Sequence, residues 1–115
     1  RVVYPPTRNV EGKIKLGWLT VGSLSELKER KPILIEYGED RVFLVKINEN
    51  VLALNASCPH LGCLLVWSND ENRFKCPCHA GFFEIDGKLI GGPPPRDMDR
   101  FEVKIEKTEI MVKGS

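Results

Sequence analysis

Short apolar runs separated by polar turns dominate the chain, and this pattern predicts strands rather than helices. Residues 32–37 and 41–47 are two such runs, and the glycine and acidic residues between them predict a hairpin turn. Residues 15–21 form another run, and residues 51–54 follow a turn at residues 48–50. Many short strands with frequent turns are typical of an antiparallel sandwich, so we expect an all-β fold.

The C-terminal strands show the clearest alternation. Residues 100–106 alternate between apolar and polar side chains, and residues 109–113 form the last expected strand. The side chains expected to fill the main core, with no functional role, come from these and the earlier strands: Phe43, Val45, Ile47, Phe101, Val103 and Ile105.

Helical periodicity is scarce and is clearest in residues 23–30, which predict one or two turns with Ser23 or Ser25 as the N-cap. We interpret four large side chains elsewhere as packing residues: Trp18, Trp67, Met98 and Met111.

Size and charge narrow the choice of function. A chain of 115 residues suits one small domain, and its net charge of +1 gives no reason to expect nucleic acid or an anionic membrane surface as a partner. We read residues 28–31 as a solvated turn.

The sequence shows neither a bilayer span nor a signal peptide, but it begins without Met, so we expect a lost N-terminal anchor to be the only link to a membrane.

The cysteines and histidines gather in two short segments. Both histidines of the chain lie beside cysteines, as Cys58-Pro-His60 and as Cys76-Pro-Cys78-His79. Two ligand pairs on separate loops are typical of a metal site, with the intervening residues as a hairpin. Three interpretations remain: two disulfides with incidental histidines, a Cys2His2 zinc site, and an iron–sulfur cluster with two cysteines on one iron and two histidines on the other.

Residues 58–63 and 76–81 resemble the two cluster-binding boxes of the Rieske proteins of cytochrome bc1 and b6f complexes, whose pattern is C-x-H-x-G-C followed by C-x-C-H-G-S. The resemblance extends to Trp67 and to the proline-rich residues 91–95, and it covers roughly residues 55–105.

This resemblance implies a ligand set and a fold. Two cysteines and two histidines are implied as ligands of a [2Fe-2S] cluster, and a second cysteine pair as a disulfide: Cys58 and Cys76 on the inner iron, His60 and His79 on the outer iron, and Cys63 with Cys78. Leu61 and the prolines at 93–95 would cover the cluster. The implied fold is a Rieske-like antiparallel β sandwich, with a base formed by residues 1–55 and 93–115 and a small cluster-binding subdomain inserted at residues 56–92.

The implied ligands determine the redox chemistry. Two ferric ions, two sulfides and two thiolates sum to zero charge, so an electron is added more easily than to a four-thiolate dianion. Rieske potentials accordingly span about −150 to +300 mV. An exposed imidazole can also gain a proton as the cluster gains an electron. In the family the second-box histidine contacts quinol, and we assign that role to His79.

One departure from the family lowers the expected potential. High-potential members have Ser and Tyr where this chain has Gly81 and Phe83, so two hydroxyl donors to sulfur are missing. We therefore expect a potential in the lower part of the Rieske range, suited to menaquinol.

The resemblance implies the iron–sulfur subunit of a quinol-oxidising cytochrome bc complex, with cytochrome b and a c-type cytochrome as partners. The isolated domain is expected to carry electrons without turnover. Alternatives are a Rieske ferredoxin feeding an oxygenase, which usually lacks the second cysteine pair, and the small subunit of arsenite oxidase. A disulfide favours the extracytoplasmic, periplasmic face of an energy-transducing membrane.

Overall fold

The computed structural model describes residues 7–9, 14–15, 17–37, 40–59, 63–78, 80–92 and 94–113, which form three sheets and one short helix. The central sheet has the order β1-β4-β5-β6-β11, which are Thr7–Asn9, Ile33–Tyr37, Asp40–Ile47, Asn50–Asn55 and Arg100–Phe101. The second has the order β12-β13-β3-β2, which are Val103–Glu106, Glu109–Lys113, Trp18–Ser23 and Ile14–Lys15. The third has the order β10-β9-β8-β7, which are Leu89–Gly91, Gly81–Phe83, Arg73–Cys76 and Val66–Ser68.

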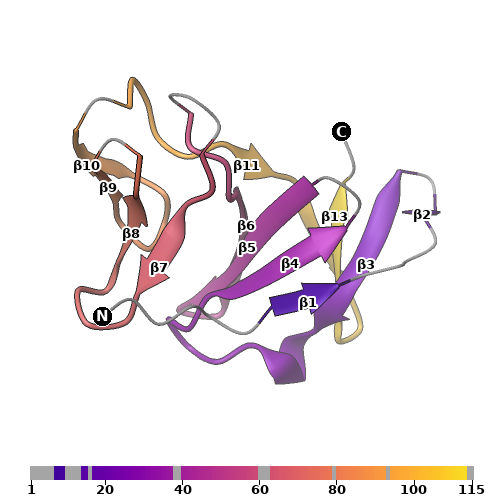
Figure 1. The fold of residues 1–115 in the computed structure, drawn as a ribbon. Helices are drawn as coiled ribbons and strands as arrows, with labels where there is room; N and C mark the ends of the chain where they lie inside the picture. Colours follow the sequence, from indigo (N-terminus) through magenta and orange to yellow (C-terminus); the bar gives the residue numbers. More distant parts are fainter. Residues whose placement is uncertain are drawn as a thin grey trace.

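The central sheet lies between the other two (Figure 1), and β5 is buried on both faces. Burial on both faces explains its uninterrupted apolar run, because alternate side chains enter different cores. One face contributes to an aliphatic core: Leu19, Val21, Leu27, Ile35, Val42, Leu44, Ala53, Ile110 and Val112. The other contributes to an aromatic core: Leu34, Phe43, Val45, Leu54, Ala56, Cys58, Leu65, Trp67, Phe74, Cys76, Phe83 and Met98.

The predicted all-β, largely antiparallel fold is confirmed. Every described pair of strands is antiparallel except β1 with β4, which is parallel. The turn between β5 and β6 places Asn48 and Glu49 at positive φ, as a tight two-residue hairpin turn requires. This turn confirms the break predicted at residues 48–50.

Two strands predicted as single elements are each divided in the structure. Residues 15–21 contain a hairpin turn at Gly17, whose φ of 83° is unfavourable for other residues, and β2 folds back onto β3. Residues 100–106 change sheets after Phe101, because β11 pairs with β6 whereas β12 pairs with β13. Apolar alternation continues through such a corner, so the sequence alone did not reveal it.

The predicted helix is a single 3-10 turn, η1, at Leu24–Glu26. Ser23 caps it as predicted, since its hydroxyl accepts from the Ser25 amide and the Glu26 carboxylate accepts from the Ser23 amide. The turn ends because Leu27 returns to extended backbone and enters the aliphatic core. Among the described residues, no helix has the length and apolar character needed to cross a bilayer.

The predicted core is correct for Phe43 and Val45, which are 1% and 0% exposed. Ile47, Phe101 and Val103 are only partly buried. The prediction that Ile105 fills the core is wrong, since its side chain is 41% exposed. The reason is that β12 is the edge strand of its sheet and Ile105 lies near the end of that strand, next to the turn to β13. Trp67 and Met98 are buried in the aromatic core, as their interpretation as packing residues requires.

Candidate metal centre

The first cysteine box lies on a loop with a closed neck. The Cys58 amide donates to the Cys63 carbonyl at 2.7 Å, and Ser57 and Leu64 form an antiparallel bridge just outside this bond. The Leu65 amide then donates to the Ala56 carbonyl at 2.7 Å. The chain therefore leaves the fold at Cys58 and re-enters it at Cys63, and these two points are held together whatever the loop binds.

The second box joins two neighbouring strands. Cys76 ends β8, Gly81 begins β9, and these two residues are paired across the strands. Ala80 adopts a φ of 52°, the left-handed conformation that lets the loop turn back into β9. The second box is thus the tip of a hairpin whose base is held by ladder pairing.

The two loops are joined by the predicted disulfide. Cys63 and Cys78 are bonded, with their Cα atoms 6.5 Å apart. Cys58 and Cys76 lie outside this bond, are 2% and 1% exposed, and belong to the same aromatic core. The structure therefore brings both boxes together and places one buried cysteine from each in a single apolar environment.

Residues 91–96, which we call the proline segment, contact the second box through Gly92 and Pro94. A side-chain β-carbon added to Gly81 would lie 2.6 Å from Cγ of Pro94 and 3.5 Å from Cβ of Cys76. One added to Gly92 would lie 2.7 Å from the Gly81 Cα atom. Two glycines therefore permit a close approach of backbones here, and the buried ring of Pro94 lies against Gly81, the residue that pairs with Cys76 across the hairpin.

This arrangement matches a known family. A family model described as the Rieske [2Fe-2S] domain matches residues 17–105. The chain belongs to this family. As a Rieske domain it carries a [2Fe-2S] cluster, a one-electron centre.

Relatives of the Rieske domain include iron–sulfur subunits named for the cytochrome b6-f complex. That of Chlorobaculum thiosulfatiphilum is 32% identical over 112 residues, covering 97% of this chain and 60% of the relative. That of Chlorobaculum tepidum is 34% identical over 113 residues, with the same coverage of 97% and 60%. The chain thus spans about 60% of the length of these relatives.

A solved structure agrees with the fold. The plasma membrane Rieske protein PetC3 from the cyanobacterium Synechocystis PCC 6803 is 28% identical, with a TM-score of 0.71 and coverage of 84% of this chain and 99% of that one.

The described residues suit the cluster. Burial disfavours a charged thiolate unless it is bound or paired, and the two cysteines in the aromatic core are the type of ligand that an iron of such a cluster takes. The predicted ligands His60 and His79, and the predicted cover residue Leu61, lie outside the described residues. The described residues therefore include the two predicted cysteine ligands but not the two predicted histidine ligands.

The positions of the two missing hydroxyls are filled by apolar groups. Phe83 is 0% exposed on β9, where it pairs with Phe74 and Leu89. At Gly81, the space that a side chain would need is taken by the Pro94 ring. A serine at position 81 would therefore have to displace the proline segment.

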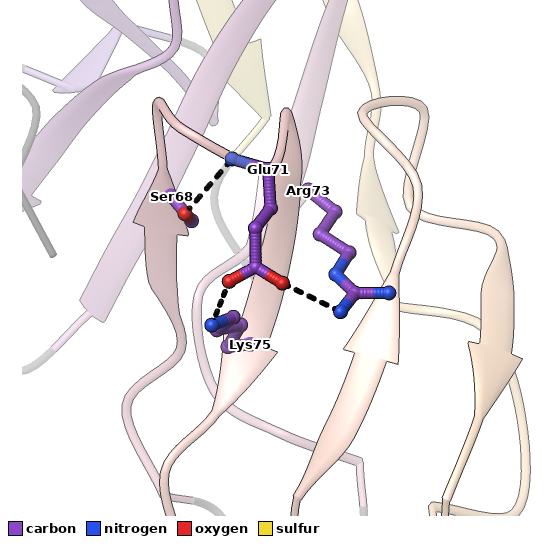
Figure 2. A network of polar contacts seen from close by, with 4 residues as sticks. All are labelled: Ser68, Glu71, Arg73 and Lys75. Carbon is purple, nitrogen blue, oxygen red and sulfur yellow. Dashed lines mark hydrogen bonds and ion pairs between the residues drawn. The ribbon is translucent and has the colours of Figure 1, made fainter. Parts of the chain in front are cut away.

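A polar network that the sequence interpretation missed braces the hairpin leading into the second box (Figure 2). The Glu71 carboxylate accepts from the Arg73 guanidinium at 2.6 Å and forms an ion pair with Lys75, while the Glu71 amide donates to the Ser68 hydroxyl at 3.2 Å. The Arg73 guanidinium also lies 4.0 Å from the centre of the Phe82 ring. Hydrogen bonds from Lys75 and then Arg73 hold the pKa of the Glu71 carboxyl below its usual value.

A sequence signal for this network did exist. Glu71, Arg73 and Lys75 occupy alternate positions, which in a strand point to the same face. The missing information was that the β7–β8 turn ends at residue 72, which places Glu71 beside both cations.

Proposed function

We propose that the cluster is bound between the two loops, by Cys58 and Cys76 on one iron and by His60 and His79 on the other. The observation that carries this proposal is the disulfide that joins two loops, each with a cysteine buried in the same apolar core. A zinc site formed by the same ligands would give the second cysteine pair no role. The base of residues 1–55 and 93–115 would then hold a cluster-binding subdomain at residues 56–92.

The proposed role is that of the iron–sulfur subunit of a quinol-oxidising cytochrome bc complex, with cytochrome b and a c-type cytochrome as partners. Support comes from relatives named as subunits of cytochrome b6-f complexes and from the Cys63–Cys78 disulfide, which Rieske ferredoxins usually lack. A disulfide also favours the periplasmic side of the membrane. The cluster, when bound, supplies a one-electron acceptor for quinol oxidation.

The chain's own residues would divide the remaining work. His79 would contact the quinol and accept its proton at the ring nitrogen that does not face iron. The buried Cys58 and Cys76 would hold the inner iron away from water. Because Gly81 and Phe83 offer no hydroxyl to sulfur, we place the potential in the lower part of the Rieske range, which suits menaquinol.

The first test is the low-temperature EPR spectrum of the purified protein after ascorbate and then after dithionite. A Rieske signal with ascorbate supports quinol oxidation, whereas a signal only with dithionite favours a ferredoxin or a quinol of very low potential. Cys76→Ser and His79→Ala should each lose the signal, and Ser57→Ala, next to the first box, is the matched control that should keep it. A colourless protein that contains zinc would refute the cluster assignment.

The low potential has its own test. Phe83→Tyr adds a hydroxyl at a buried position, and we expect the midpoint potential to rise if that hydroxyl donates to sulfur. A hydroxyl that finds no partner would instead leave the potential unchanged and destabilise the fold by about 1–3 kcal/mol. That second result would contradict the hypothesis that the potential is low because hydroxyl donors to sulfur are missing.

A further inference from the structure

The proline segment lies inside a longer loop, and two hydrogen bonds close that loop just outside the segment. The Leu89 amide donates to Oδ1 of Asp97 at 2.8 Å, and the Met98 amide donates to the Gly87 carbonyl at 2.9 Å. Only the second bond is between backbone groups. The chain from Leu89 to Asp97 is therefore a closed loop, in which one of the two closing contacts depends on a side chain.

The Asp97 carboxylate accepts from a backbone amide at the edge of a sheet. Leu89 starts β10, which is the edge strand of its sheet, so no strand among the described residues neighbours its outer side. The Asp97 carboxylate supplies an acceptor to the Leu89 amide there. Asp97 is itself exposed, and two acidic residues near it have other partners: Asp99 pairs with Arg96, and the Asp86 carboxylate accepts from the Lys88 amide. The Leu89 contact is thus specific to one carboxylate.

The same loop carries the groups that cover the second box. Gly92 approaches the backbone of Ala80 and Gly81, and the Pro94 ring fills the space beside Gly81 and Cys76. Pro94 is buried, although Asp97 at one end of its loop is exposed and Leu89 at the other end is only partly buried. The seating of Pro94 therefore depends on how the two ends of the loop are held together, and the Asp97 carboxylate joins one end to the other.

We propose that Asp97 is a positioning residue for the cluster: by holding Leu89, its carboxylate seats the proline segment on the second box and excludes water from Cys76. This inference rests on the proposed binding of the cluster between the two loops. Solvent exposure is one of the factors that set the potential of an iron–sulfur cluster. Since reduction takes the Rieske cluster from neutral to negative, water admitted beside Cys76 favours the reduced state and raises the potential.

The test compares three variants of the holoprotein. Asp97→Ala removes both the charge and the acceptor, Asp97→Asn removes the charge but keeps an acceptor oxygen, and Asp99→Asn removes an equal charge two positions away. Hydrogen exchange of the peptide that contains Leu89 is measured by mass spectrometry, and the midpoint potential is measured by EPR-monitored titration.

We expect exchange at Leu89 to accelerate about tenfold or more in Asp97→Ala, the factor that follows from losing a hydrogen bond to a charged acceptor. Asp97→Asn should retain most of the protection, and Asp99→Asn should retain all of it. The potential should rise more in Asp97→Ala than in either asparagine variant.

Two results would overturn the proposal. Unchanged exchange at Leu89 in Asp97→Ala would show that the carboxylate does not close the loop. Faster exchange with equal potentials in Asp97→Ala and Asp99→Asn would show that closure serves stability alone. A failure of the underlying cluster assignment is separate, because it would appear as a retained Rieske signal in Cys76→Ser, whatever Asp97 does.

Discussion

The two cores on opposite faces of the central sheet are built from different residues. The buried members of the aliphatic core are Leu, Ile, Val and Ala only, and they join the central sheet to β3 and β13. The aromatic core contains Phe43, Trp67, Phe74 and Phe83 together with Cys58 and Cys76. One core thus serves the fold alone, whereas the other packs rigid rings around the residues proposed to hold the cluster.

The ring packing in the aromatic core is close. The centre of the Phe74 ring lies 4.7 Å from that of Phe43 and 4.9 Å from that of Trp67, at tilted and edge-on angles favourable for aromatic pairs. Phe74 is also two residues before Cys76 on β8. Displacement of these rings should therefore reach the second box, while changes in the aliphatic core should not.

The largest expected effect tests directly whether the two cores differ in their influence on the cluster. Phe74→Ala should lower the free energy of unfolding by about 3–5 kcal/mol and Leu44→Ala by about 2–5 kcal/mol. Only Phe74→Ala should also broaden or shift the EPR signal of the cluster. Chemical denaturation and EPR on the same samples check both statements. A comparable spectral change in Leu44→Ala would mean that the two cores are not separate in their influence on the cluster.

A smaller effect is expected from the disulfide. Its partners are 15 residues apart in sequence, and a closed loop of that size contributes about 3 kcal/mol in the chain-entropy model. In the double variant Cys63→Ser/Cys78→Ser, we expect the cluster to be lost at a lower denaturant concentration than the one that unfolds the aliphatic core. Visible absorbance reports the first transition and far-ultraviolet circular dichroism the second. Coincident transitions, as in a single cooperative unit, would argue against this separation.

The smallest expected effect concerns the network at the outer side of β8. Because the folded-state pKa of Glu71 is lowered from 4.5, the carboxylate stabilises the fold above that value, and this contribution disappears as the pH falls through the lowered pKa. Glu71→Gln should therefore reduce stability slightly at neutral pH and converge with the unmodified protein in acid. Thermal unfolding as a function of pH measures the difference. An equal difference at every pH would exclude titration of Glu71 as its cause.

Local patterns in the sequence predicted the strand content, the Ser23 cap and the turn after β5, because these depend on neighbouring residues. The resemblance to Rieske proteins predicted the Cys63–Cys78 pairing, which the structure confirms. Features that depend on tertiary partners were missed, such as the change of sheet after Phe101 and the exposure of Ile105. The roles of His60 and His79 remain predictions.

The second sheet joins residues that are far apart in the chain, since β13 pairs with β3. During synthesis, the meander β7–β10 is complete well before Ile110 and Val112 leave the ribosome. Those two side chains, both 0% exposed, are needed to cover the aliphatic core. Among the described strands β13 is therefore added last, so that a nascent chain can form the hairpin of the second box before the aliphatic core is closed.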